Sequence, residues 1–380
     1  MISPSKTIEP LLERADIRID GPRPHDMRVH DRRLRRRVLT GGSLALGEAY
    51  VEGWWDVEAL DDFFVRLLRA DPYHATAAIP VLWHKLRAAF INLQSKTRAF
   101  HVGRAHYDLG NDLYKTMLDP RMIYSCAYWT DPDSTLEQAQ EAKLRMVCEK
   151  LRLEPGMRVL DIGCGWGGAA AFAAKTYGVS VTGITISEQQ AAYAADACKE
   201  LPVEIRLQDY RDTDGQFDRI FSIGMFEHVG KRNYRTYMQT LRRLLKPDGI
   251  ALLHTIGGNQ PTCIIDPWIG TYIFPNAMLP SPSQIGRAVE GLLVIEDWHN
   301  IGPHYDPTLM AWHRNFTAGW ERLRERYDDR FYRMWTYYLQ SCAALFRTRR
   351  KQVWQLVLSP SGVQGGYRPL RCPACQSPRP

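Results

Sequence analysis

The feature that most constrains this 380-residue chain is a glycine-rich turn between an apolar run and an alanine-rich run. Val159 to Ile162 is typical of a buried strand and carries one acid, Asp161, and the alanine-rich segment predicts a helix. The turn contains Gly163, Cys164, Gly165, Gly167 and Gly168. Glycine permits positive φ and lets a ligand approach bare backbone. Strand, glycine turn and helix form the first unit of a doubly wound α/β domain, which binds ligands at the carboxyl ends of its strands.

The alternation of strand and helix continues along the chain. Further strands are predicted at 179–186, 203–210, 217–226, 249–257, 292–302 and 353–359, the last of them at an edge of the sheet. Before the first strand we expect a helix with Ser134 as N-cap and Glu137 completing a capping box. The pattern predicts a Rossmann-like, mostly parallel sheet covered by helices.

Composition divides the chain into three parts. Residues 1–97 predict a smaller, mainly helical domain, 98–360 the α/β domain, and 361–380 a Gly/Pro-rich tail that we expect to be disordered. An apolar fraction of 45% and a charged fraction of 24% are typical of a globular protein. No apolar run approaches the ~20 residues that span a bilayer, and the first residues lack a signal-peptide core, so we expect a cytoplasmic protein.

The net charge of +7 is mild for this length and does not indicate nucleic-acid binding. The positive charge is local, with five arginines between Arg32 and Arg37 and ten basic against four acidic residues between Arg314 and Lys351. Each run is either a solvated helix face or a contact for anionic lipid. The eight cysteines are scattered, as expected of reduced thiols, and Cys372 with Cys375 lacks the second pair of a zinc site, so no metal is predicted.

The residues around the turn favour one nucleotide-like ligand over two others. A phosphate-binding loop would end in Gly-Lys-Ser/Thr, which is absent here. The spacing fits a dinucleotide fingerprint, but the second strand lacks the acid that binds NAD ribose at its end. S-adenosylmethionine (SAM) suits Asp161 before the turn and Asp209 with Tyr210 at the end of the third strand, where a carboxylate would meet the adenine amino group.

Eight segments in order carry a family resemblance. They are HYDLGNDLY, YSCAYW, LDIGCGWGG, GITISEQQ, FSIGMFEHVG, LLHTIG, DWHNIGPHYDPTLMAW and CAALFRTR. Together they resemble cyclopropane-fatty-acyl-phospholipid synthase and, from about Arg98 to Leu358, the mycolic acid cyclopropane synthases. The resemblance implies a class I SAM-methyltransferase fold and a lipid-binding N-terminal domain.

The resemblance also implies a reaction and the residues for it. The family transfers a methyl group from SAM to a cis double bond of an acyl chain, after which ring closure loses a proton. Aromatic faces can stabilise the intermediate carbocation, and the base is thought to be a bound bicarbonate ion. The positions that match the family's base site are Cys126, Glu227, His254, Ile256 through its backbone, and Tyr305. Cys342 matches a cysteine once proposed as catalytic, although no step requires a thiolate and we favour a structural role.

The same matching gives a set of cofactor contacts. They are Tyr124, Ser125, Asp161, Gly163, Cys164, Gly165, Gly167, Thr185, Ile186, Gln190, Asp209 and Tyr210. The segment Asp266 to Pro280, with Trp268 at an expected loop position, predicts a lid over lipid.

Plainer interpretations stay open for single residues. Glu227 with His228 could be a surface pair, His254 a satisfied core histidine, and Cys126 a small buried hydrophobe.

Two other functions are weighed against cyclopropane formation. A related lipid C-methyltransferase would leave a methyl or methylene branch, and an inactive protein would only bind SAM or lipid. A nucleic-acid methyltransferase is disfavoured because no nucleophile motif for base chemistry is correctly placed. The partners expected are unsaturated phospholipid acyl chains, the inner face of the membrane as a peripheral surface, and a possible homodimer.

Overall fold

The computed structural model describes residues 5–70, 110–261 and 265–371, and the chain divides into two compact units. Unit 1 comprises Met1–Ile91, Cys263–Pro275 and Tyr305–Lys351, and unit 2 comprises Asn92–Thr262, Asn276–His304 and Gln352–Pro380. The boundary expected after residue 97 lies outside the described residues and stays a prediction. Within the described part, the helices of Tyr305–Lys351 group with the N-terminal residues, so each unit draws on distant stretches of the chain.

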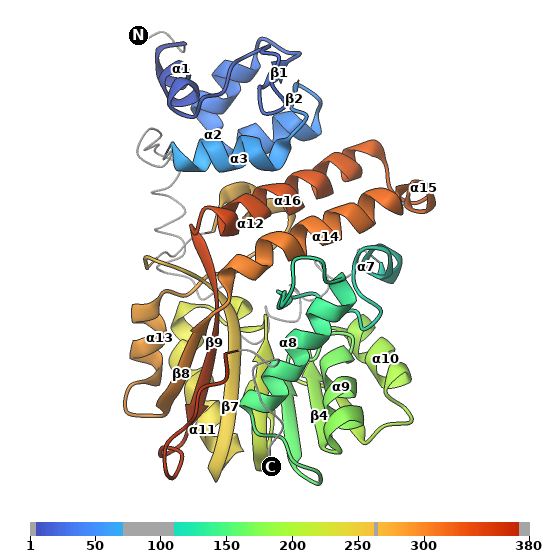
Figure 1. Cartoon of the computed structure of the whole chain (residues 1–380), viewed down its shortest axis with the longest axis vertical. Helices are drawn as coiled ribbons and strands as arrows, with labels where there is room; N and C mark the ends of the chain where they lie inside the picture. Colours follow the sequence, from blue (N-terminus) through green and yellow to red (C-terminus); the bar gives the residue numbers. More distant parts are fainter. Residues whose placement is uncertain (1–4, 71–109, 262–264, 372–380) are drawn as a thin grey trace. The chain divides into compact units, whose positions relative to one another are not determined.

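Unit 1 is mainly helical. Its elements are α1 (Ser5–Arg14), β1 (Arg28–Val29), α2 (Leu34–Val51), β2 (Trp55–Asp56), α3 (Leu60–Arg69), α12 (Pro267–Tyr272), α14 (Tyr305–Ala318), α15 (Trp320–Leu323) and α16 (Asp329–Arg347). Helix α16 packs against α14, α3 and α2 (Figure 1). Arg333 of α16 donates to the backbone oxygens of Tyr50 and Trp55, which joins the long helix to the N-terminal helices.

Residues 266–275 of the segment expected to form a lid belong to unit 1, and Trp268 lies in the core of that unit. Asp266 caps α12, and Trp268 is 1% exposed, with its ring centroid 4.4 Å from that of Tyr337. A Cβ atom on Gly47 would lie 2.4 Å from the Trp268 ring, so the glycine makes room for the indole. The prediction of a loop tryptophan over lipid is therefore wrong: helix packing buries this side chain.

Unit 2 contains a seven-stranded sheet of order β5-β4-β3-β6-β7-β9-β8. The strands are β3 (Arg158–Ile162), β4 (Ser180–Thr185), β5 (Val203–Leu207), β6 (Phe217–Ile223), β7 (Leu245–Gly258), β8 (Val294–Asn300) and β9 (Lys351–Ser359). Strands β5, β4, β3, β6 and β7 pair in parallel with their neighbours in this order, and β8 pairs antiparallel with β9. The α/β prediction is confirmed, but β9 lies between β7 and β8 rather than at an edge (Figure 1).

Helices cover both faces of this sheet. They are α8 (Leu136–Lys150), α9 (Gly168–Tyr177), α10 (Glu188–Ala197), α11 (Tyr234–Leu244) and α13 (Pro282–Val289). Helix α7 (Asn111–Met117) is joined to the glycine turn, where the Trp166 indole N–H donates to the Asn111 side chain. Alternate strand residues point to opposite faces. Leu160 and Leu253 accordingly join the core formed with α11 and α13, whereas Val159 and Leu252 join the core formed with α8 and α9. His254, two residues after Leu252, thus belongs to the face covered by α8.

Two local predictions need correction. Helix α8 is capped by Thr135, whose side chain accepts from the Gln138 N–H while the Gln138 side chain accepts from the Thr135 N–H, so the capping box begins one residue after Ser134 and uses Gln138 rather than Glu137. Residues 361–371 of the expected tail are held in unit 2, where Tyr367 donates to the Lys150 backbone oxygen at 2.8 Å. The remainder of that tail lies outside the described residues.

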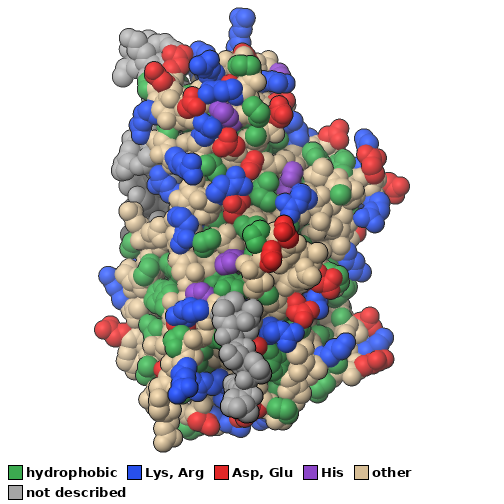
Figure 2. Space-filling model, in the orientation of Figure 1, with side chains coloured by type: hydrophobic (Ala, Val, Ile, Leu, Met, Phe, Trp, Pro, Cys, Tyr) green, Lys and Arg blue, Asp and Glu red, His purple; other side chains and the backbone are tan. Residues whose placement is uncertain are grey.

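None of the described helices is long and apolar enough to cross a membrane. The face of the protein drawn in Figure 2 carries lysine and arginine side chains interspersed with acidic and apolar ones. In the arginine run of α2, Arg37 forms ion pairs with Glu48 and Glu52, so part of the positive charge is balanced within unit 1.

Candidate active site

The glycine turn lies between β3 and α9, at the carboxyl end of β3. Strand β3 has a neighbouring strand on each of its two sides. Strand β4 pairs on one side of β3 and β6 on the other, which makes this the switch point at which an open α/β sheet binds its ligand. Gly163, Gly165 and Gly167 have φ of +87°, +54° and +84°. A Cβ atom on Gly168 would lie 2.0 Å from the Arg121 backbone oxygen, so a side chain is excluded there as well. Positive φ therefore favours glycine at the first three positions, and the close contact with Arg121 requires it at Gly168.

Asp161 lies on β3, just before the turn, and is 2% exposed. Its Oδ2 atom has no hydrogen-bond partner among the described residues, and burial raises the pKa of the carboxyl to about 8. A buried polar atom without a partner normally has one in the functional state. Asp161 therefore has capacity to accept a hydrogen bond from a bound ligand.

Lys143 of α8 is a buried cation beside Asp161 that the sequence analysis missed. Its side chain is 0% exposed, and its Nζ donates to the Ser125 Oγ at 2.8 Å. Burial lowers the pKa of Lys143 to about 8, against the charges of Asp119 and Asp161. The available signal was the position of this lysine within the apolar stripe of α8, beside Leu144 and Val147.

The segment Tyr124 to Cys126 approaches the same region. Gln140 of α8 donates to the Ser125 backbone oxygen at 2.9 Å. Ser125 is therefore held against α8 by both Gln140 and Lys143. The Cys126 Sγ donates to the Ala127 backbone oxygen at 3.2 Å, and this side chain is 1% exposed. The Tyr124 ring contacts Tyr114, which in turn contacts Trp166 of the glycine turn.

The end of β4 carries a polar cluster of three side chains. The Thr185 hydroxyl donates to Gln190 Oε1 at 3.1 Å and accepts from the Ser187 N–H, and Ser187 accepts from the Gln190 N–H as the N-cap of α10. The predicted cap at Ser187 is confirmed. Ile186 joins this cluster to α10 and is half-buried.

At the end of β5, the carboxylate of Asp209 is engaged by its neighbour. Arg211 binds both carboxylate oxygens at 2.7 Å. The Tyr210 hydroxyl, on a short helix η1 (Tyr210–Asp212), is buried without a partner among the described residues, and burial raises its pKa to about 12. A ligand amino group at Asp209 would thus share that carboxylate with Arg211.

A second cluster forms where β6 and β7 end. Glu227, on a short helix η2 (Phe226–His228), accepts from the Ile256 N–H through Oε1 at 2.6 Å, while its Oε2 is buried without a partner in the described chain. Burial raises the pKa of Glu227 to about 7, against the hydrogen bond from Ile256. Near neutral pH this carboxyl can therefore either donate or accept a proton.

His254 is buried in the same cluster, two residues before Ile256 on β7. Burial holds the pKa of His254 well below its ordinary value, and the charges of Lys143 and Lys150 lower it further. The imidazole is consequently neutral. The same two lysines create a positive potential here, which together with a neutral histidine and the free Glu227 oxygen suits a small anion.

Two of the predicted catalytic residues belong to unit 1. Tyr305 begins α14, is 8% exposed, and has its ring centroid 4.6 Å from that of Phe346. Cys342 lies on α16, where burial, followed by the charge of Asp266, raises its pKa to about 12. Cys342 is therefore a protonated thiol at neutral pH, a poor nucleophile.

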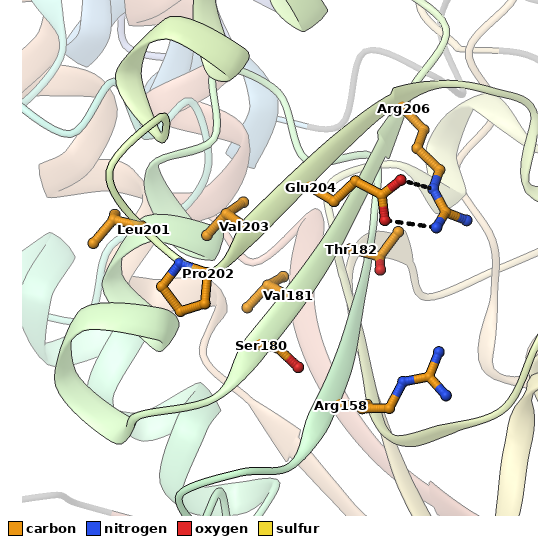
Figure 3. A pocket seen from close by; sticks show the side chains of 9 residues that line it. All are labelled: Arg158, Ser180, Val181, Thr182, Leu201, Pro202, Val203, Glu204 and Arg206. Carbon is orange, nitrogen blue, oxygen red and sulfur yellow. Dashed lines mark hydrogen bonds and ion pairs between the residues drawn. The ribbon is translucent and has the colours of Figure 1, made fainter.

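A shallow depression on unit 2 lies away from both clusters. It is lined by Arg158, Ser180, Val181, Thr182, Leu201, Pro202, Val203, Glu204 and Arg206 (Figure 3). Arg158, Ser180 and Val203 begin β3, β4 and β5, so the depression is at the amino ends of the strands. It carries a Glu204–Arg206 ion pair and none of the predicted site residues.

The strand order, the switch-point glycine turn and the buried acid before it define the protein as a Rossmann-like, class I SAM-dependent methyltransferase. The profile of the family described as mycolic acid cyclopropane synthetase matches residues 94–356. The chain therefore belongs to the mycolic acid cyclopropane synthetase family.

Individual relatives agree with this assignment. The chain is 54% identical over 366 residues to the cyclopropane-fatty-acyl-phospholipid synthase of Escherichia coli K12, covering 95% of this chain and 94% of that one. It is 38% identical over 253 residues to a probable fatty acid methyltransferase of Pseudomonas putida, covering 63% of this chain and 64% of that one. The crystal structure of mycolic acid cyclopropane synthase CmaA1 complexed with SAH and CTAB matches with 34% identity and a TM-score of 0.64, over 68% of this chain and 97% of that one.

Proposed function

We propose that this protein converts cis double bonds of unsaturated acyl chains in phospholipids into cyclopropane rings with SAM as donor. The observation that carries the proposal is 54% identity to the E. coli cyclopropane-fatty-acyl-phospholipid synthase over 95% of this chain, which extends beyond the segment matched by the family profile. In the net reaction the methyl carbon of SAM forms bonds to both alkene carbons, S-adenosylhomocysteine leaves, and one proton goes to a base.

The residues around the glycine turn fit SAM. SAM supplies an electrophilic methyl group on a sulfonium centre. The positive-φ glycines leave open backbone, the partnerless Asp161 Oδ2 suits an amino group, and the Thr185–Gln190 pair lies at the end of β4. The predicted contacts Tyr124, Ser125 and Asp209 border the same strand ends. Their role in binding is part of the proposal.

The cluster of Glu227, His254 and Ile256 fits the proposed bicarbonate ion. Bicarbonate would supply the base for the proton lost on ring closure. In this proposal the neutral His254 and the free Glu227 oxygen hold the ion, the lysine charges compensate its negative charge, and Cys126 and Tyr305 complete the site. The Ile256 N–H already binds Glu227, so Ile256 would act by holding that carboxylate.

The location and assembly expected from the sequence also stay proposals. We place the protein in the cytoplasm, peripherally at the inner face of the membrane, with unit 1 containing the lipid-binding residues and a homodimer as its assembly. The arginine run on α2 supports this only in part, since Arg33 and Arg37 lie over the Trp54 ring and Arg37 is ion-paired.

A second candidate differs only in the product. The relative named probable fatty acid methyltransferase supports a protein that leaves a methyl or methylene branch. Ring and branch share methyl transfer to the alkene and differ in which proton leaves the cation.

Vesicles test both candidates. Purified protein is incubated with methyl-labelled SAM and vesicles of a phospholipid with monounsaturated chains, and the released fatty acids are analysed by gas chromatography with mass spectrometry. We expect label in a saturated chain with the retention time of the cyclopropane standard; label in a branched chain would select the second candidate. Vesicles of fully saturated phospholipid are the control, and absence of label from the unsaturated chains would overturn both candidates.

A further inference from the structure

Behind His254 lies a row of polar side chains, buried except for the half-buried His299, that no predicted role uses. His254, Gln355 and His299 come from β7, β9 and β8, which are neighbours in the sheet (Figure 1). Gln355 and His299 are directly paired across the antiparallel strands, so their side chains share a face. Lys150, the last residue of α8, covers that face. Gln355 and Lys150 are each 0% exposed, and His254 is 2% exposed.

Hydrogen bonds connect these side chains. The Lys150 Nζ donates to Gln355 Oε1 at 2.8 Å and lies 2.9 Å from the His299 Nδ1. The Gln355 Nε2 lies 3.3 Å from the His254 Nδ1. Buried polar groups in folded proteins nearly always have hydrogen-bond partners, because leaving one unpaired destabilises the fold. The hydrogen bonds of this row therefore offset the cost of burying its polar groups.

The chemistry of lysine determines how the amide is oriented. Below its pKa of about 7, Lys150 is an ammonium group with three donors and no acceptor, so in that state it binds only the oxygen side of the Gln355 amide. The NH₂ side then faces His254 as a donor. The Nδ1 of His254 must accept, and in a neutral imidazole the proton then sits on the other nitrogen, Nε2.

We propose that Gln355, held by Lys150, is a positioning residue that keeps the ring proton of His254 on Nε2. The inference rests on the proposed function because it places His254 in the base site. There, the Nε2–H group donates a hydrogen bond to the anion, and the ring cannot take the proton that the base must remove. The neutral state required of His254 agrees with its lowered pKa.

His299 is a second hydrogen-bond partner of Lys150, in addition to Gln355. Burial, followed by the charge of Lys150, lowers the pKa of His299 to about 4, so this ring is also neutral and its Nδ1 accepts from the ammonium. Asp297 and Arg371, which form an ion pair, are the other charged groups near Lys150. The row thus begins in an ammonium group and ends at the histidine of the base site.

Histidine-selective ¹⁵N NMR tests the tautomer without any need for activity. Below the Lys150 pKa of about 7, we expect the His254 signals, assigned by their loss in His254→Gln, to show protonated Nε2 and unprotonated Nδ1 in the wild-type protein. Gln355→Glu replaces the donor with an acceptor of nearly the same shape, so the proton should move to Nδ1. A wild-type His254 protonated on Nδ1, or a tautomer unchanged by Gln355→Glu, would overturn the proposal.

Activity gives a second measurement. In Gln355→Leu and Gln355→Glu we expect kcat to fall by about 10- to 100-fold, the range known for outer partners of functional histidines, with the Kd for SAM changed by less than about 2-fold. The matched control is Gln352→Glu, on the same strand, whose Oε1 accepts from Asn300. It should leave the tautomer of His254 unchanged.

The two measurements separate this inference from the proposed function. If wild-type protein makes no cyclopropane chains but shows the expected tautomer and its reversal, the proposed function fails and the positioning role stands. If wild-type protein is active and Gln355 variants do not change the tautomer, the positioning role alone fails. Lys150→Met, which removes the group that orients the amide, provides the test should a Gln355 variant fold poorly.

Discussion

Helix α8 carries two buried lysines whose surroundings differ. Lys143 and Lys150 are seven residues apart, so they lie on one face of the helix, two turns from each other. Lys143 donates to Ser125 and has Asp119 and Asp161 close enough to raise its pKa. Lys150 binds the neutral acceptors Gln355 and His299. By their hydrogen bonds, one lysine belongs to the cofactor cluster and the other to the proposed base cluster, while the charges of both act on His254.

The difference shows how one helix can serve two parts of a site. Burial dominates both pKa values and lowers that of Lys143 to about 8 and that of Lys150 to about 7. Carboxyl groups partly compensate the charge of Lys143. Near Lys150, Asp297 raises the pKa but Arg371 lowers it again. The carboxyl groups near Lys143 suit a cationic cofactor, whereas the charge of Lys150 among neutral donors and acceptors suits the orientation of an imidazole and the attraction of an anion.

The largest expected effect comes from removing the carboxyl of the base cluster. Glu227→Gln should lower kcat by at least about 100-fold, because the site loses a group that can exchange a proton near neutral pH. The Kd for SAM should change by less than about 2-fold. The vesicle assay and isothermal titration calorimetry measure the two quantities, and the exposed Glu290→Gln is the control. A parallel loss of SAM affinity would show that the two clusters are not separate.

Lys143→Met should act on the opposite cluster. Ser125 loses a donor and Asp161 its neighbouring cation, at a cost of about 1–3 kcal/mol, so the Kd for SAM should rise by roughly 5- to 150-fold. Lys150→Met should change that Kd by less than about 3-fold, since its partners belong to the other cluster. Isothermal titration calorimetry measures the Kd for SAM in both variants. Equal increases in this Kd would show that the two lysines do not act on separate clusters.

A smaller effect is expected in the pH dependence of stability. Between its folded pKa of about 7 and its unfolded value of 10.5, Lys150 binds a proton only when the chain is unfolded. Stability should therefore rise with pH in this window, with a contribution of about 1 kcal/mol per pH unit from one such group. Urea unfolding from pH 7.5 to 9.5 should show a slope lower by this amount in Lys150→Met. An unchanged slope would mean that the folded protein keeps Lys150 protonated.

The smallest effect is expected at Cys342. Because burial raises the pKa of this thiol to about 12, Cys342→Ala should change kcat/KM by less than about 3-fold, with any loss appearing in the melting temperature. Cys148→Ala, at a buried cysteine of α8, is the matched control. A loss of kcat/KM of about 100-fold with an unchanged melting temperature would restore a catalytic role to Cys342.

Much of unit 2 could be predicted from local pattern. The alternation of strand and helix, the glycine turn and the cap at Ser187 each depend on residues close in sequence, and the structure confirms them. The position of β9 could not be predicted, because nothing local distinguishes a strand that inserts between β7 and β8 from one at an edge. Trp268 was misassigned for a related reason, since its burial depends on Tyr337 and Gly47, far away in the chain.

By itself, the sequence determined the fold class, the place of the cofactor turn and the residue types of the proposed base site, because short motifs and period-two strands encode these. Only the tertiary structure decided which neighbours give those residues their protonation. The free Glu227 oxygen, the neutral His254 and the two buried lysines depend on burial and on contacts between β7, β9 and α8. A pKa is set by solvent exclusion and nearby charge, which distance along the chain does not reveal.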